Sequence, residues 1–541
     1  MIRHSSRRLF LSVALLAFLY TPSFAARPAA GPGTFDVLPD NYNQIHYVSE
    51  TTGSNENGDG SKTQPWKTIQ HALTNSTSAS KTNRLAIFVA AGIYNDATLN
   101  MKPHVDCYGG FDLTNWQRNI FKHKTILDGS HKYRILIGAN HARLDGFIIR
   151  AGKIRGRGAA LLCDGTSPTI TNNRFVDNRT QKPKNWSPKY WHELANDGAA
   201  IFSVNGAKPI IRHNTFANNR TEIGRGAAIA MHGHCAGEIS HCVFLDNATG
   251  TEDLDRSSDG GAISVFDWSS PKIANNILLE NKAFNKNDGG GIFVALWSSP
   301  QIVNNIFVGN RSTDDGGALF VGGQEHRYGK PFDPLPNAQE FNVEILNNAF
   351  FGNENRGLNS GGIRLTMQAR ATVQNNILAH DARFQIQNCQ AIIANNTILE
   401  NTTLEEMPQH TAANLLDQNI FWARLHVRKK GTKIPNDAPR VGQQPHFLDD
   451  QKLLTIESSS YDAHQHFTIL KIKDGQLAEN QLSRRVVRFQ HRWGVVKSNS
   501  DSQIAVWGDV TGYSKCSVLP TFQLHPSDPD FARGPKQLVN K

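Results

Sequence analysis

Short apolar runs alternate with turn residues at regular intervals along most of the chain. The clearest case is residues 259–281, DGGAISVFDWSSPKIANNILLEN, which are followed at once by residues 288–310, DGGGIFVALWSSPQIVNNIFVGN. Each copy holds three apolar runs, separated by a Gly-Gly turn, a Trp-Ser-Ser-Pro turn and an Asn-Asn corner. Short strand patterns repeated at an interval are typical of a β-solenoid. We therefore predict that each copy forms one coil.

An apolar residue two places after each asparagine corner marks further coils. The markers recur at intervals of 20 to 43 residues, and they are Phe175, Phe216, Phe244, Leu278, Phe307, Phe350, Leu378, Ile398 and Phe421. Apolar runs at 85–150 imply earlier coils. One coil cannot bury both sides of its strands, so it needs neighbours above and below. The pattern predicts an all-β fold, a parallel β-helix of about ten to twelve coils.

Asparagine recurs at two fixed places in the coil. Asn tolerates left-handed backbone angles, and its amide can hydrogen-bond to the same amide one rung away. We therefore expect these residues to form turns and ladders. The first place is the corner, at 172–173, 275–276, 304–305, 347–348, 375–376 and 395–396. The second place is the end of the third run, at Asn178, Asn219, Asn247, Asn281, Asn310 and Asn353.

Both ends of the chain depart from the coil pattern. Residues 1–25 predict an export signal, because they contain a basic start, an apolar core and a small-x-small cleavage site. The pair Arg7-Arg8 is compatible with a twin-arginine signal, and a general secretory signal is the alternative. The core is too short for a membrane span. We expect an exported protein, located in the periplasm, at the cell surface or outside the cell. The predicted segments are 1–25 signal peptide, 26–44 lead-in, 45–425 β-helix and 426–541 small C-terminal β cap or accessory module.

Residues 46–73, HYVSETTGSNENGDGSKTQPWKTIQHAL, predict a strand, a loop and a short helix with Ile69 and Leu73 on one face. With the apolar runs that follow, this succession resembles the N-terminal module of secreted right-handed parallel β-helix proteins of the pectate-lyase-like superfamily. The GGAI and FxxN repeats are similar to those of polymorphic outer-membrane proteins. The resemblance implies a right-handed β-helix whose first coil is capped by the helix. It leaves the activity open, because the superfamily includes lyases, hydrolases, epimerases and non-catalytic surface proteins.

The charge balance bears on the partner. The chain has 57 Lys and Arg against 47 Asp and Glu, a formal net charge of +10, or about +7 without the predicted signal. A positive net charge favours a polyanion. No arginine-rich tail or known nucleic-acid module occurs in the sequence. We therefore expect a monomer that meets an acidic polysaccharide or an anionic cell surface, and no nucleic acid.

The six cysteines are too few for a disulfide scaffold in 541 residues. Cys235 and Cys242 flank one predicted strand and are the candidates for a disulfide in an oxidising compartment. The other four are expected to be small buried residues. No Cys or His spacing typical of zinc occurs in the sequence.

The insertion at 179–197, RTQKPKNWSPKYWHELAND, is the most suggestive candidate for a ligand site. Insertions in a β-helix gather along particular edges and build a cleft wall there. Aromatic faces stack on sugar rings, and cations attract uronate or sulfate groups, so Trp186, Lys189, Trp191 and His192 are candidate substrate-binding residues. The alternative is a loop whose aromatic rings fold back onto the coil for cover.

A row of charged residues precedes the glycines at equivalent coil positions. Asp197, Asp259, Asp288 and Asp315 belong to it, and Arg225 fills the position between the first two. Rungs lie about 4.8 Å apart, so neighbouring and next-neighbouring aspartates have spacings that suit retaining or inverting glycosidases, and also a calcium site. Ordinary Asp-Gly turn chemistry is the competing explanation. Asp259, Asp288 and Asp315 are the candidate catalytic residues, Arg225 is a candidate contact for an anionic group, and no metal ligand is assigned.

Two classes of function remain open. The first is an exported protein that binds an acidic polysaccharide and cleaves it, as a lyase or as a glycoside hydrolase. The second is a non-catalytic cell-surface or matrix solenoid, similar to an adhesin, that serves as a rigid spacer. The sequence lacks the motif series of polygalacturonases, so it does not select the chemistry or the cofactor. An enzyme would need the 179–197 insertion and the charged row to line a groove.

Overall fold

The protein is described from a computed structural model. It describes residues 29–33, 37, 39–182, 184, 196–251, 258–323, 341–355, 362–380, 383–387, 389–399, 447–473, 475–522 and 527–528, and the backbone of short strands at 402–405, 415–417, 420–421, 425–427 and 440–441. Within these residues there are one short α-helix, α1 (Ile69–Asn75), and 51 β-strands.

One coil shows how the repeat folds. It runs through β23 (Ile263–Phe266), β24 (Lys272–Ala274), β25 (Ile277–Leu279) and β26 (Lys282–Ala283), and then enters β27 (Ile292–Val294) of the next coil. Equivalent strands of successive coils pair in parallel and in register. The Trp-Ser-Ser-Pro turn lies between the first two strands, and the Asn-Asn corner lies between the next two.

Stacking of coils produces four parallel sheets. Sheet A has 13 strands, from β1 (Gln44–Val48) to β42 (Leu415–Asp417), and sheet B has 13, from β3 (Gly92–Tyr94) to β45 (Arg440–Val441). Sheet C has 12 strands, from β4 (Leu99–Asn100) to β44 (Leu425–Val427), and sheet D has seven, from β10 (Lys153–Ile154) to β34 (Glu354–Asn355). The predicted parallel β-helix is confirmed, and it is slightly longer than the ten to twelve coils expected.

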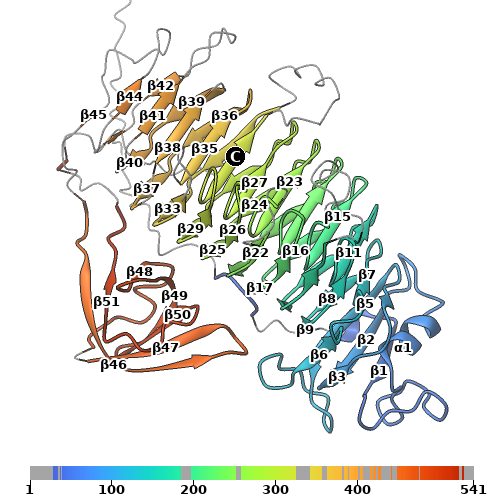
Figure 1. The fold of residues 1–541 in the computed structure, drawn as a ribbon. Helices are drawn as coiled ribbons and strands as arrows, with labels where there is room; N and C mark the ends of the chain where they lie inside the picture. Colours follow the sequence, from blue (N-terminus) through green and yellow to red (C-terminus); the bar gives the residue numbers. More distant parts are fainter. Residues whose placement is uncertain are drawn as a thin grey trace, which may run out of the picture.

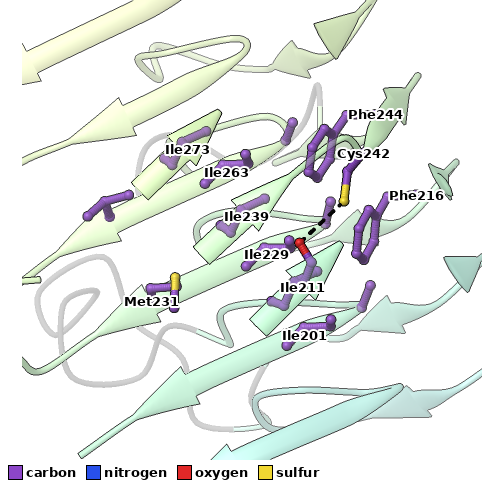
Figure 2. Close-up of a cluster of buried hydrophobic side chains, with 14 of the residues drawn as sticks. Ile201, Ile211, Phe216, Ile229, Met231, Ile239, Cys242, Phe244, Ile263 and Ile273 are labelled. Atoms are coloured by element: carbon purple, nitrogen blue, oxygen red, sulfur yellow. Dashed lines mark hydrogen bonds between the residues drawn. The ribbon is translucent and has the colours of Figure 1, made fainter. Parts of the chain in front are cut away.

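The core consists of identical positions stacked on one another. Figure 2 shows Ile201, Ile229 and Ile263 aligned from coil to coil, beside the stacked rings of Phe216 and Phe244. The centroids of these two rings lie 5.0 Å apart with the planes 6° from parallel. All these side chains are fully buried. Each coil therefore covers its neighbours' apolar surface, which explains why one coil alone would not be stable.

The predicted asparagine ladders are present. At Asn305, in the corner position, the side-chain Nδ2 donates to the carbonyl of Ile273 at 2.9 Å and to Oδ1 of Asn348 at 3.0 Å. Its own Oδ1 accepts from the backbone N and Nδ2 of Asn276, each at 2.9 Å. The second ladder repeats this pattern from Asn178 to Asn353. These side chains satisfy buried backbone groups, so their role is structural.

Cys242 replaces asparagine in one coil of the corner ladder. Its Sγ donates to the carbonyl of Ile211 at 3.7 Å, as Figure 2 shows, and accepts the backbone N–H of Asn214 at 3.5 Å. All six cysteines are free and buried. The candidate disulfide between Cys235 and Cys242 is therefore not formed. The sequence comparison between coils would have shown that Cys242 occupies a ladder position.

The N-terminal helix forms as predicted and closes the first coil. The hydroxyl of Thr68 caps it by accepting the backbone N–H of His71 at 3.3 Å. Ile69, Ala72 and Leu73 are buried on one face, and α1 packs on β1, β2 (Leu85–Ala90) and β4. The helix covers apolar side chains at the end of the solenoid, where no further coil can do so.

The C-terminal module is a closed six-stranded antiparallel barrel with the strand order β46-β47-β50-β49-β48-β51. Figure 1 shows it, in orange and red, lying along the side of the solenoid rather than at its end. The strands are β46 (Lys452–Asp462), β47 (Phe467–Ile472), β48 (Val486–Arg488), β49 (Trp493–Asn499), β50 (Gln503–Trp507) and β51 (Lys515–Val518).

The barrel covers the outer face of sheet B. In β25 the residue that points inward, Leu278, is flanked by Ile277 and Leu279, which are also apolar and buried. They join one apolar cluster with barrel residues such as Val495 and Trp507. In β24 of sheet A, by contrast, the outward residue Lys272 is polar and exposed. The strands β25, β29 (Ile306–Val308), β33 (Ala349–Phe351) and β37 (Ile377–Ala379) of sheet B are all apolar, and they give the barrel an apolar surface on which to dock.

Trp493 is one of the barrel residues that contact the solenoid. Its indole lies against Gly309 and Gly352, which both have φ of +62° and occupy one turn position in successive coils. A Cβ atom on Gly352 would come within 2.2 Å of the Trp493 ring. Other coils have Asp246, Glu280 or another larger residue at this turn position. The two glycines make room for the indole.

We expect Gly352→Ala to loosen the barrel. The clash with Trp493, added to the left-handed backbone angle, should lower the free energy of unfolding by about 2–4 kcal/mol. Gly206→Ala is the matched control, because Gly206 has φ of +72° and its Cβ would meet no atom within 4 Å. Urea unfolding followed by tryptophan fluorescence measures both variants. Equal losses in the two variants would contradict the close contact between Trp493 and Gly352.

Candidate functional site

The charged row lies where the chain passes from sheet D to sheet C. Oδ1 of Asp259 accepts the backbone N–H of Asp288 at 3.0 Å, and Oδ1 of Asp288 accepts that of Asp315 at 2.9 Å. The three candidate catalytic residues therefore stand on successive rungs. Asp259 and Asp288 each bind the backbone of the next turn with one oxygen, which leaves the other oxygen for charge pairing or chemistry.

Arg225 lies inside the row and not at its surface. Its side chain is only 2% exposed, and its Nε is 3.7 Å from Oδ2 of Asp259. The guanidinium carbon lies 4.3 Å from the centroid of the Phe266 ring. Its backbone N–H donates to Oδ1 of Asp197 at 2.8 Å, one rung away. This burial favours a structural role for Arg225 over direct contact with a ligand.

Asp197 has two further partners. Its Oδ2 lies 3.4 Å from Nε of Arg157 and 3.5 Å from Nδ1 of His232. Burial acts to raise the pKa of Asp197, but His232, Arg157 and Arg225 outweigh it and hold the pKa below its usual range. Burial lowers the pKa of His232, although the neighbouring Asp197 carboxylate opposes the shift. Asp197 is therefore an ionised, fully enclosed link between coils.

Asp288 is a member of the row whose pKa is raised. It is half-buried. Burial, followed by the charges of Asp259, Asp315 and Asp314, raises the pKa of Asp288 well above its usual range. Burial also raises the pKa of Asp259, although Arg225 opposes the shift. A partly exposed carboxyl that keeps its proton is the kind of group that acts as a general acid.

Asp288, Asp314 and Asp315 form the open part of the row. One carboxylate oxygen from each lies within 4.8 Å of the others, and all three side chains are half-buried. Nε of Arg364, in β35 (Ile363–Thr366), lies 3.6 Å from Oδ2 of Asp315. Carboxylate oxygens are the ligands that Ca²⁺ prefers, and these three would supply part of the about six to eight oxygens it takes. The cluster therefore fits both an acid–base pair and a shared cation.

His232 and Ser264 extend the network onto the outer face of sheet C. His232, at the end of β19 (Ile229–His232), places Nε2 3.0 Å from the hydroxyl oxygen of Ser264, while its Nδ1 faces Asp197. The order Asp–His–Ser is that of a catalytic triad. Ser264, however, has no exposed surface. In this arrangement the hydroxyl satisfies a buried histidine and has no access to a substrate.

The sequence located only part of this site. Trp186, Lys189, Trp191 and His192, the candidate substrate-binding residues of the 179–197 insertion, lie outside the described residues, and their role stays a prediction. Arg157 could have been found, because Arg157-Gly158 repeats the charged residue before glycine. Arg364 and Ser264 could not, because the outward position of sheet C that they occupy holds phenylalanine in several other coils and gives no sign of a polar site.

The structural role of Arg225 can be tested with Arg225→Lys. Lysine keeps the charge but loses the planar contact with Phe266, so the free energy of unfolding should fall by about 1–2 kcal/mol. Arg179→Lys is the control, because the Arg179 side chain is 42% exposed. Thermal unfolding and glycan binding are measured on both variants. Weaker glycan binding by Arg225→Lys with unchanged stability would restore Arg225 as a ligand contact.

A match to a protein-family model supports the fold. A family model described as "Right handed beta helix region" matches residues 90–328. No curated protein matches the chain. A solved structure of the tailspike protein of E. coli bacteriophage HK620, in complex with a pentasaccharide, is 11% identical, covers 84% of this chain and 89% of its own, and has a TM-score of 0.29. A mutant of that tailspike, also in complex with the pentasaccharide, is 11% identical to this chain and has a TM-score of 0.28. The match covers 84% of this chain and 89% of the mutant tailspike. The pentasaccharide is a ligand of the tailspike.

In the part of the chain that the structure describes, no helix has the length and apolar character needed to cross a membrane.

Proposed function

We propose that the protein is an exported β-helix protein that binds an acidic polysaccharide and hydrolyses it at the open end of the charged row. One observation carries the proposal. Asp288 has a raised pKa and lies beside a second carboxylate, Asp315, with oxygen atoms of the two within 4.8 Å. A carboxyl group with a raised pKa, held at short distance from a second carboxyl group, is the arrangement that glycoside hydrolysis uses.

The two residues would take different roles. Asp288, protonated, donates its proton to the glycosidic oxygen as the bond to the anomeric carbon breaks. Asp315, paired with Arg364, attacks the anomeric carbon and forms a glycosyl ester. Water then displaces the ester while the Asp288 carboxylate takes its proton. The short separation favours this retaining course, because inverting enzymes keep their carboxyl groups about 6.5–9.5 Å apart.

Asp259 has a supporting role in this proposal. Its two oxygens face the backbone of Asp288 and the side chain of Arg225. Its charge helps to raise the pKa of Asp288. A lyase needs a base beside the uronate, and it is less well supported, because Arg225 is buried and Lys189 and His192 lie outside the described residues. The positive net charge of the chain favours an anionic polymer over a neutral one.

The second candidate function is a non-catalytic solenoid that acts as a spacer on a cell surface or in a matrix. It is favoured by the hydrogen bonds from backbone N–H groups to Asp259 and Asp288, which give the aspartates a structural reason to be present. In that case the row would hold the turns together and would have no substrate.

Incubation of the protein with uronic-acid and sulfated glycans distinguishes the two functions. New reducing ends without unsaturated products indicate a hydrolase, whereas absorbance from unsaturated products indicates a lyase. Added calcium or a chelator shows whether Asp288, Asp314 and Asp315 need a cation. The absence of product with every glycan, with and without calcium, would reject the enzymatic proposal and leave the spacer.

A further inference from the structure

Two hollows flank the hairpin between β48 and β49, where the barrel meets the solenoid. One has a volume of about 660 Å³ and is lined from the solenoid by Arg311, Glu354 and His380. The other has a volume of about 560 Å³ and opens on the barrel side, beside Tyr513 and Lys515. His380, Arg488, Phe489 and Gln490 line both. We call the two together the junction cleft. Its size is that of a site for a small molecule or a few sugar units.

Positive charge predominates in the junction cleft. Its lining contains four permanent cations, Arg311, Arg488, Arg492 and Lys515, and one acidic residue, Glu354. Glu354 and Arg311 form an ion pair at 3.5 Å. Arg492 reaches Glu280, outside the lining, at 2.6 Å. These pairs hold Arg311 and Arg492 in place, whereas Arg488 and Lys515 have no carboxylate partner among the residues that the structure describes.

Arg488 is the cation best placed for a ligand. Its guanidinium carbon lies 5.3 Å from the centroid of the Trp493 ring, its register partner across the hairpin. Among the residues that the structure describes it has no carboxylate partner, and its side chain is exposed. Burial, and then Arg488 itself, lower the pKa of the neighbouring His380, in agreement with a positive potential in the cleft. Arg488 is therefore held in position while its N–H donors remain available.

We propose that the junction cleft is a second binding site, which takes a carboxylate or sulfate group of an anionic sugar chain, with Arg488 as the principal contact. A guanidinium group presents paired N–H donors that match the geometry of a carboxylate or a sulfate. The contact between Trp493 and the paired glycines holds the barrel beside the solenoid, so the cleft is formed before any ligand arrives. Pre-formed donors lose little freedom on binding.

The inference rests on the proposed function only for the choice of ligand. The site itself is separate from the charged row, because no residue of the row lines either hollow. It would hold the polymer by its acidic groups while Asp288 and Asp315 act elsewhere on the chain. A polymer held at two places binds more tightly than at either alone.

Calorimetric titration of the full chain at low salt tests the proposal. The probes are an oligogalacturonide, which has carboxylates, a dextran sulfate, which has sulfates, and neutral dextran. Arg488→Gln should weaken binding of at least one anionic probe about 10-fold or more, and Arg488→Lys should restore part of the affinity. Lys272→Gln, which removes an exposed charge from sheet A, should bind as the unmodified protein does. Thermal unfolding of each variant shows that the fold is kept.

Each outcome has one meaning. The carboxylated and sulfated probes decide which acidic group the cleft prefers. Equal affinities of Arg488→Gln and Lys272→Gln would overturn the proposal, and so would a failure of the unmodified protein to prefer either anionic probe over neutral dextran. Arg488-dependent binding without any cleavage of the glycan would support the junction cleft and reject the hydrolase. If Arg488→Gln still cleaves the glycan and binds it with unchanged affinity, the hydrolase is supported and the junction cleft is rejected as a binding site.

Discussion

Asn305→Ala is expected to lower the free energy of unfolding by about 3–5 kcal/mol, because it leaves several buried polar groups without partners. The substitution removes the acceptor for the backbone N–H and Nδ2 of Asn276, and the donor to the carbonyl of Ile273. Asn305 has no exposed surface, so water does not replace these bonds. Urea unfolding followed by circular dichroism measures the loss.

The chain itself offers the matched control. Cys242 occupies the equivalent place in another coil, and its sulfur still makes hydrogen bonds to the backbone N–H of Asn214 and the carbonyl of Ile211 in the preceding coil. Asn305→Cys should therefore be clearly less destabilising than Asn305→Ala. If the two variants unfold at the same denaturant concentration, the ladder does not act through the hydrogen bonds of its side chains.

Asp288→Asn is expected to reduce the rate of glycan hydrolysis by about 10²- to 10⁴-fold, the range for loss of a general acid. An amide has almost the shape of the carboxyl group, and its oxygen can still accept the backbone N–H of Asp315. The fold and the affinity for the glycan should therefore persist. Rates of reducing-end formation and calorimetric binding, measured on the same preparation, separate loss of chemistry from loss of binding.

A second aspartate serves as the control for Asp288. Asp177→Asn should leave the rate unchanged, because Asn218 fills the same turn position one coil further along. The pH profile gives an independent test. The pKa of Asp288 is raised, so its acid form persists to higher pH than that of an ordinary carboxyl and disappears as the pH rises through the raised value. The alkaline limb of the rate profile should therefore change in Asp288→Asn. A full rate in that variant would remove Asp288 from the mechanism.

The sequence predicted the fold well because each coil repeats the same physical requirement. A buried Phe at 216 and 244, or an Asn at 276 and 305, recurs with a fixed partner above and below, so the repeat itself reports the contact. The cap helix was also readable, from the spacing of Ile69 and Leu73. In each case the residues that pack together are also related by the period.

The predicted site was less complete because its partners are not related by the period. The successive rungs of Asp259, Asp288 and Asp315 follow from the repeat, but the burial of Arg225 does not. The burial of a side chain outside the core depends on what covers the outer surface of the solenoid. The repeat reports only the contacts between side chains that point into the core. The junction cleft could not be predicted from the sequence for the same reason. Arg488 and His380 are distant in sequence, and they line one hollow only because the barrel folds back onto the solenoid.

Gly309 and Gly352 make room for Trp493, and they also determine where along the solenoid the barrel docks. A solenoid has approximate translational symmetry, and a module that docks on its side meets similar surfaces every rung, about 4.8 Å apart. Sliding by one rung towards the N-terminus would bring the indole onto Glu280, and sliding the other way would bring it onto His380. Two adjacent residues without side chains break that symmetry. They define a single docking position for the barrel along a solenoid whose coils otherwise present similar surfaces.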